Sequence, residues 1–239
     1  MKRRSIILLI IFLIIIISAG LVACKYYDYI SMFYKAATTS SEKLQESKQE
    51  ADQRAMEAIK EYGIETVRPL TEEETEKLNN GELTEEEAVN IVLGRLDGEV
   101  STQNNNSSVQ GTSANDNGLS EAVLKEKNAE IAQLIGKVYV LKAKFTNELD
   151  AVEKWVHSEY NKLTKEEKKS TSAKVKIGKE AYSRALALEA DCDIQMEEIL
   201  DRLTVLLEET GQSTTLVGEI RTAYENEKTV KISYYMDKI

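Results

Sequence analysis

The sequence LKEKNAEIAQLIGKVYVLKAKFTNELDAVEKW, residues 124–155, carries the clearest structural signal in the chain. Its large apolar residues recur at alternating intervals of three and four, which is the spacing of one face of an α-helix. These residues are Leu124, Ile131, Leu134, Val138, Leu141, Phe145, Val152 and Trp155, and Ile135, Leu149, Val156 and Leu163 widen the stripe. The pattern predicts one amphipathic helix over residues 119–163, about 65 Å long.

Two more helices are predicted downstream. The same spacing resumes after a lysine-rich turn and predicts a helix over 172–209 that ends at Gly211, then a shorter helix over 214–237. The two stripes consist of Tyr182, Ala185, Glu189, Cys192, Met196, Ile199, Leu203 and Leu206, and of Leu216, Ile220, Ala223, Val230 and Tyr234. Three such helices bury their stripes most simply as an antiparallel bundle or a coiled-coil hairpin with the third helix packed on it. We therefore expect residues 119–239 to form an all-α bundle domain, and a sustained heptad also permits a homo-oligomer.

A short acidic motif occurs twice before this domain. Leu70-Thr71-Glu72-Glu73-Glu74 recurs as Leu83-Thr84-Glu85-Glu86-Glu87. Each copy is typical of a capping box, in which the threonine and the glutamate three residues later each bind the other's backbone amide. We expect short helices over 72–79 and 85–94, within a small acidic helical unit over 64–97. Its apolar contacts are expected from Leu78, Ala88, Ile91, Val92 and Leu93.

Two polar segments flank the acidic unit. Residues 98–118 are mostly Asn, Ser, Gly, Thr and Gln, with almost nothing to bury, and are predicted to be a disordered linker. Residues 25–63 carry a thin, alanine-rich apolar stripe from Ile30 to Ile59. That stripe predicts a helical stalk or a weakly packed coiled coil, continuous over about 26–62.

The N-terminal segment is predicted to be a membrane anchor. Ile6 to Cys24 is almost entirely apolar and spans about 28 Å as a helix, close to the hydrocarbon thickness of a bilayer. Lys2, Arg3 and Arg4 precede it, and the positive-inside rule keeps such a flank in the cytoplasm. The rest of the chain is then expected outside the cytoplasm, at the cell membrane.

Residues 1–24 can also be interpreted as a cleavable signal. Leu21-Val22-Ala23-Cys24 resembles the lipobox of bacterial lipoproteins, which implies cleavage before Cys24 and lipid modification of its thiol. Ser18-Ala19-Gly20 offers a small-x-small site for full release. An uncleaved single-pass anchor, a lipid anchor on Cys24 and full release stay open, and all three export the domain.

Composition and motifs exclude several classes of function. A net charge of −10 and a pI near 4.9 argue against nucleic-acid binding. His157 is the sole histidine and has no spaced Cys or Asp partners, so no catalytic triad or metal site is predicted. The acidic motifs lack the spacing of a calcium loop, and their glutamates suit the positive ends of helices. We expect no catalytic, cofactor-binding or metal-binding residues, and no enzyme.

Lysines gather at the predicted turn between the two long helices. They are Lys165, Lys168, Lys169, Lys174 and Lys176, flanked by Lys162 and Lys179. In an acidic protein this excess indicates contact with an anionic partner, either a cell-surface polymer or the chain's own acidic unit. The alternative is a solvated loop, with charges offset by Glu166, Glu167 and Glu180.

The sequence as a whole predicts a membrane-tethered, extracytoplasmic helical scaffold or accessory protein of the cell envelope. It would act by protein–protein contact through its helices, without a cofactor or a reaction. The alternative is an extracytoplasmic module that senses or binds a small ligand between its helices. An apolar pocket between the second and third helices of the bundle would favour that alternative.

Overall fold

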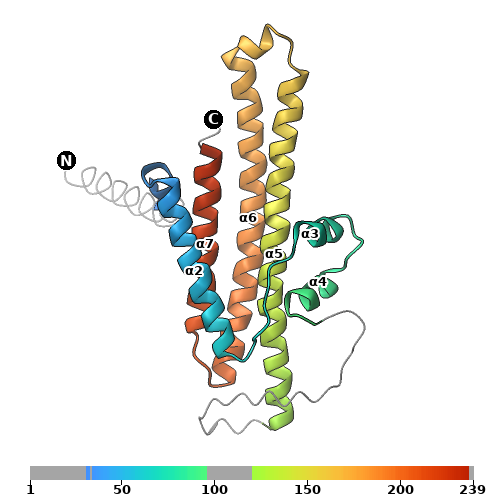
Figure 1. Ribbon diagram of the computed structural model, residues 1–239, viewed down its shortest axis with the longest axis vertical. Coiled ribbons are helices and arrows are strands. Elements are labelled where there is room, and N and C mark those ends of the chain that lie inside the picture. The colour runs from blue at the N-terminus through green and yellow to red at the C-terminus, as the bar shows by residue number, and fades with distance from the viewer. Residues whose placement is uncertain (1–30, 33, 96–119, 237–239) are drawn as a thin grey trace, which may run out of the picture. The chain divides into compact units, whose positions relative to one another are not determined.

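The computed structural model is all-helical over the residues that it describes, which are 31, 32, 34–95 and 120–236. In chain order the elements are α2 (Ser41–Glu61), α3 (Glu72–Asn79), α4 (Glu85–Val92), α5 (Glu121–Lys162), the 3-10 helix η1 (Glu167–Lys169), α6 (Thr171–Glu209) and α7 (Thr215–Met236) (Figure 1). The predicted all-α class is confirmed. The predicted anchor, residues 1–24, and the predicted linker, residues 98–118, lie outside the described residues. Among the helices of the described ranges, none combines the length and apolar composition that a membrane span requires.

The chain divides into two compact units. The larger unit is Arg54–Arg221, and the smaller consists of the described residues up to Gln53 and from Thr222 onward. α2 and α7 each contribute residues to both units.

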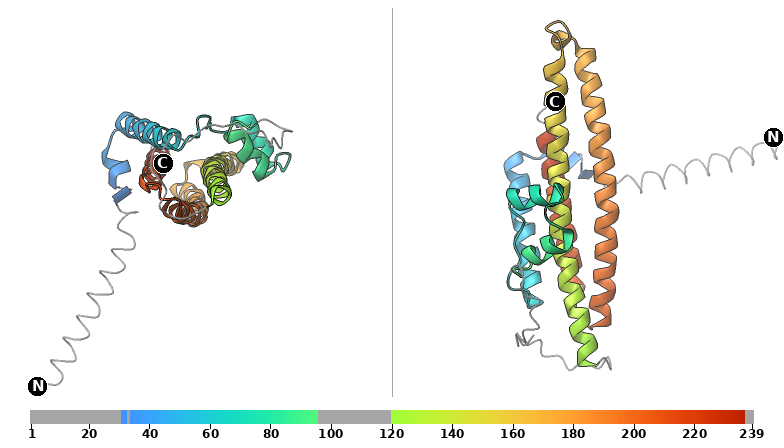
Figure 2. Two further views of the ribbon diagram at one scale, coloured as in Figure 1. Left: turned by 90° about the horizontal axis from the view of Figure 1, so that it is seen from below. Right: turned by 90° about the vertical axis from the view of Figure 1, so that its right-hand side faces the viewer.

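The larger unit is built on α5 and α6, which lie side by side and antiparallel (Figures 1 and 2). Lys127 pairs with Glu209 at 2.7 Å, near one end of the hairpin. Further along, the Arg202 guanidinium donates to Glu130 through Nε at 2.7 Å and Nη2 at 3.0 Å. Residue numbers thus fall along α6 as they rise along α5, which is the antiparallel hairpin that the heptads predict.

The core of the hairpin uses the middle of the stripe predicted for α5 and the C-terminal part of the stripe predicted for α6. α5 buries Ile131, Leu134, Ile135, Val138, Leu141, Phe145 and Leu149, and α6 buries Cys192, Met196, Leu200, Leu203, Leu206 and Leu207. In the same unit, α7 adds Leu216, Val217 and Ile220. Ile199, expected on the seam, is only half-buried, while its neighbour Leu200 is fully buried.

α6 ends where the sequence predicts, through a Schellman motif at Gly211. The Gln212 amide donates to the Leu207 carbonyl at 2.8 Å, and the Gly211 amide donates to the Glu208 carbonyl at 3.0 Å. Gly211 has φ +68°, a left-handed conformation that costs glycine little. The Tyr62 hydroxyl donates to the Ser213 carbonyl, which ties the end of α2 to the turn before α7.

The acidic segment packs on a second face of α5. Ala88, Val89, Val92 and Leu93 of the α4 region form a buried cluster with Ala132 and Val140 of α5, and Ile64, Val67, Leu70, Leu78, Leu83 and Tyr139 lie at its edge. The Arg68 amide donates to the Val92 carbonyl at 3.0 Å and closes residues 64–95 on themselves. Ile91, which we expected to supply an apolar contact, is not part of the cluster.

The segment predicted as a continuous helical stalk differs from that expectation in two ways. The helix is interrupted at Thr39–Ser40. α2 begins after this break, where the Leu44 amide donates to the Ser40 carbonyl. The thin stripe is also buried: Leu44 and Ala51 in the smaller unit, and Ala55 and Ile59 in the larger one. Alanine is small enough to let another helix approach closely, so a thin stripe can still pack.

α7 contacts α2 in the larger unit and the residues before α2 in the smaller one. In the larger unit, Nε of Arg54 is 3.1 Å from Oε2 of Glu219. In the smaller unit, Nζ of Lys35 donates to Oδ1 of Asn226 at 3.1 Å, and Ala36, Ala223 and Tyr224 are buried.

Candidate interaction surface

The end of the α5–α6 hairpin that holds the connecting turn is the candidate site. We call residues 150–188 the distal segment: the last part of α5, the turn with η1, and the first part of α6. None of its residues is fully buried, although the apolar stripe continues through it. Tyr160, Val175 and Tyr182 are 38%, 47% and 54% exposed.

The difference in burial along the hairpin has a structural cause. Two helices alone cannot enclose the side chains between them, so a stripe is fully buried only where a third element covers it. α3 and α4 pack on α5 around Ala132 and Val140, and α7 pairs with α6 through Arg221 and Glu197. Along the distal segment every residue is at least partly exposed, so nothing encloses the stripe there. Its apolar side chains are therefore left at the surface.

The turn itself is fixed by a third copy of the acidic motif. In Leu163-Thr164-Lys165-Glu166-Glu167, the Thr164 amide donates to Oε2 of Glu167 at 2.9 Å, and the Glu167 amide donates to Oγ1 of Thr164 at 3.2 Å. These bonds hold the pKa of Glu167 below its usual value, the backbone amide contributing most. We did not identify this copy in the sequence, although its Leu-Thr-x-Glu-Glu spacing repeats that of the other two. α6 then begins at the cap Ser170.

The predicted lysines do gather around this turn. Lys165, Lys169, Lys174 and Lys176, together with Lys179, are exposed and form no ion pair with any described residue. Lys168 lies over the Tyr160 ring, 5.3 Å from its centroid, and Lys162 pairs with Glu159 at 2.6 Å. Further back, the Arg184 guanidinium stacks on Trp155 at 4.0 Å. The distal segment thus combines exposed cations with exposed aromatic and aliphatic groups.

The other acidic or reactive candidates form no catalytic or metal-binding cluster among the described residues. The His157 side chain is 73% exposed, as expected of a solvated histidine, with Nε2 3.6 Å from Glu153. Cys192 is buried in the core and in no disulfide, whereas Cys24 lies outside the described residues. Glu189, the one charged residue in the predicted stripe of α6, is buried. Within the described ranges, no group of three or more Cys, His, Asp or Glu side chains is arranged to hold a metal ion.

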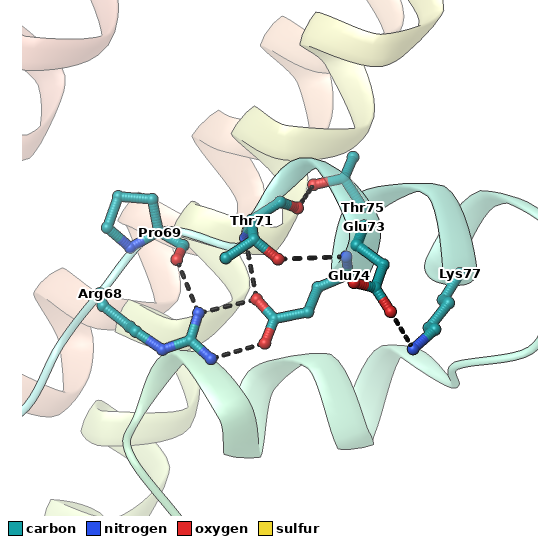
Figure 3. A network of polar contacts seen from close by, with 7 residues as sticks. All are labelled: Arg68, Pro69, Thr71, Glu73, Glu74, Thr75 and Lys77. Carbon is teal, nitrogen blue, oxygen red and sulfur yellow. Dashed lines mark hydrogen bonds and ion pairs between the residues drawn. The ribbon is translucent and has the colours of Figure 1, made fainter.

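The acidic motifs act as helix caps, as predicted. The Thr71 amide donates to Oε2 of Glu74 at 2.8 Å, and Arg68 donates to both oxygens of the same carboxylate at 2.7 and 2.6 Å (Figure 3). The bond from Arg68 is the main reason that the pKa of Glu74 falls to about 2, and the bonds from Thr71 lower it further. Thr84 and Glu87 form the second capping box.

The distal lysines do not reach the chain's own acidic unit. That unit lies beside the middle of α5, where Nζ of Lys144 is 3.8 Å from Oε2 of Glu85. α5 continues as one helix from Lys144 to Lys162, a rise of about 27 Å. Of the two anionic partners that the sequence suggested, the contact within one chain is therefore not formed.

Comparison of the chain with protein-family models, with curated proteins and with solved structures finds no match.

Proposed function

We propose that this protein is a membrane-tethered, extracytoplasmic helical scaffold that acts through protein contact at the distal segment of its α5–α6 hairpin. The tether is the N-terminal segment, as a single membrane span or as a lipid on Cys24. We expect the protein to catalyse no reaction. The protein would position a partner at a fixed distance from the membrane.

The exposed surface of the distal segment is the observation that carries the proposal. Tyr160, Val175 and Tyr182 expose large side chains beside lysines that have no partner among the described residues. Tyrosine is enriched at protein interfaces because one ring supplies both apolar area and a hydrogen-bonding group. A single exposed apolar residue needs no explanation, but several gathered at the end of one hairpin indicate a contact surface.

The alternative function, binding of a small ligand between helices, receives no such support. In the larger unit, the seam where α6 meets α5 and α7 is filled by Met196, Leu200, Leu203, Leu207 and Leu216, each at most 1% exposed. Close-packed side chains of this kind leave no room for a ligand without repacking.

Site-specific photo-cross-linking in cells tests the proposal. A photoreactive side chain in place of Tyr182 should give discrete protein adducts after irradiation. The same group in place of Glu208, which is exposed on the same helix but outside the distal segment, should give few or none. Equal adducts at both positions, or none at Tyr182, would contradict a contact surface at the distal segment.

A further inference from the structure

We infer that the distal segment docks on the α3–α4 glutamates of a second copy of this chain. This inference rests on the proposed function, because it names the partner of the same surface. The contact would be a salt-dependent self-association in which each copy contributes one basic and one acidic surface.

The basic surface lies around the turn of the hairpin. Residues 162–179 contain seven lysines and only two acidic residues, Glu166 and Glu167, in a chain whose net charge is −10. One of those two, Glu167, is engaged by Thr164. The lysines without an ion pair among the described residues are Lys165, Lys169, Lys174, Lys176 and Lys179. The local field at this end of the hairpin is thus positive.

The acidic surface lies on α3 and α4 and their caps. Residues 71–87 contain eight glutamates and one lysine. Glu73, Glu74 and Glu85 pair with Lys77, Arg68 and Lys144. Glu87 is engaged by Thr84. The other four carboxylates, Glu72, Glu76, Glu82 and Glu86, are exposed and form no ion pair with any described residue. Eight glutamates and one lysine give this surface a net charge of −7, opposite in sign to the +5 that seven lysines and two glutamates give to residues 162–179.

The two surfaces of one chain cannot meet. Glu85 of the acidic surface lies beside Lys144, and the unbroken helix from Lys144 to Lys162 rises about 27 Å. In two copies placed antiparallel, the turn of each hairpin can approach the acidic surface of the other. A two-fold arrangement forms this contact twice and closes, so it gives a dimer rather than a filament.

Two properties of the protein favour such pairing. The exposed Tyr160, Val175 and Tyr182 add apolar area beside the lysines, so the contact does not rest on charge alone. A shared membrane also raises the effective concentration of one copy near another, which strengthens weak contacts.

Zero-length cross-linking tests the contact directly. An equal mixture of unlabelled and nitrogen-15-labelled full chains, in micelles of a neutral detergent, is treated with a carbodiimide that joins lysine to carboxylate. We expect mixed-isotope peptides that link Lys165, Lys169, Lys174 or Lys176 to Glu72, Glu76, Glu82 or Glu86. If these lysines form no mixed-isotope links, the inference is wrong.

Exchanging the charges of the two surfaces tests the same contact through the equilibrium of self-association. Replacing Lys165, Lys169 and Lys176 with Glu should weaken self-association of the full chain about tenfold, as should replacing Glu72, Glu76 and Glu86 with Lys. Mixing the two variants should restore it, since each then supplies the charge that the other requires. Replacing Lys43, Lys60 and Lys125 with Glu is the control for the lysine variant, because it makes the same change in net charge at exposed positions elsewhere. It should weaken self-association much less. Sedimentation velocity at low and high salt measures the self-association of the two variants, their mixture and the control.

The outcomes separate this inference from the proposed function. A wild-type chain that stays monomeric at low salt overturns self-association, and so does a mixture of variants that fails to associate. Binding of the distal segment to anionic vesicles, without mixed-isotope links, would assign it to a membrane surface instead. Cross-links from Tyr182 to a different protein in cells would then still support the proposed function.

Discussion

A β-carbon on Gly136 of α5 would lie 2.7 Å from Cγ1 of Val89 on α4. This separation is far below van der Waals contact, so α4 can approach α5 this closely only because residue 136 has no side chain. Both residues are buried, and Leu93 lies 3.4 Å from the same point. The position of the acidic segment on the hairpin therefore depends on one glycine.

Gly136→Ala should destabilise the packing of α4 on α5. The added methyl group meets a short, buried, β-branched side chain that has little freedom to move, and overpacking of this kind typically costs about 1–3 kcal/mol. Gly178→Ala is the matched control, because a β-carbon on Gly178 meets nothing within 4 Å and alanine favours the helix. Urea denaturation of both variants measures the contrast. Equal stability of the two would mean that α4 does not pack on Gly136.

Leu200 and Leu203 should contribute most to the core of the hairpin, since both are fully buried. Replacing either with Ala removes packed methyl groups and should lower the free energy of unfolding by about 2–5 kcal/mol. Ile194→Ala is the control on the same helix, because Ile194 is 61% exposed, and it should cost about 0.5 kcal/mol or less. Similar losses at all three positions would show that the stripe of α6 is not a core.

Much of this fold could be predicted from local signals. Heptad spacing predicted α5, α6 and α7 to within a few residues of their ends, because a long amphipathic stripe has few alternatives to a helix. The capping boxes at Thr71 and Thr84 were predicted with their partners, since the two reciprocal bonds need only residues three apart.

Other features depend on tertiary contacts that spacing does not encode. Ala132, Gly136 and Val140 lie four residues apart on a second face of α5, but small residues among polar ones do not resemble a core. Nothing local indicated that α4 would cover them. Likewise, the stripe looks the same at Val152 as at Val138, although only the part covered by further helices is fully buried. Glu197 and Arg202, which lie off the stripe, pair with Arg221 and Glu130.

The capping box of α3 should respond to acid. The pKa of Glu74 lies near 2 in the folded chain, below its ordinary value of 4.5, chiefly because Arg68 donates to the carboxylate. The stability that this carboxylate contributes is therefore complete above about pH 4.5 and is lost as the pH falls through about 2. Arg68→Ala should raise the pKa of Glu74 in the folded chain, so the carboxylate contributes less stability and its loss on acidification is complete at a higher pH.

Carboxyl NMR titration measures this shift. Glu87 is the internal control, because its pKa is lowered by the backbone amide and the hydroxyl of Thr84, without an arginine. Arg68→Ala should leave the titration of Glu87 unchanged. If Glu74 titrates at the same pH in the variant and in the native chain, the arginine contact is not formed in solution.

Acetylation of lysines in intact cells, with a reagent that cannot cross the membrane, tests the central claim most directly. Mass spectrometry compares the distal lysines Lys165, Lys169, Lys174 and Lys176 with the exposed control lysines Lys43, Lys60 and Lys125, in cells and after purification of the chain into high salt, which also weakens a charged contact between copies. We predict that the control lysines react equally in cells and after purification, because the domain lies outside the cytoplasm. The distal lysines should react several times more slowly in cells than after purification, because a protein partner covers them. Control lysines that react only after lysis would contradict export, and distal lysines that react equally in both would contradict a contact surface.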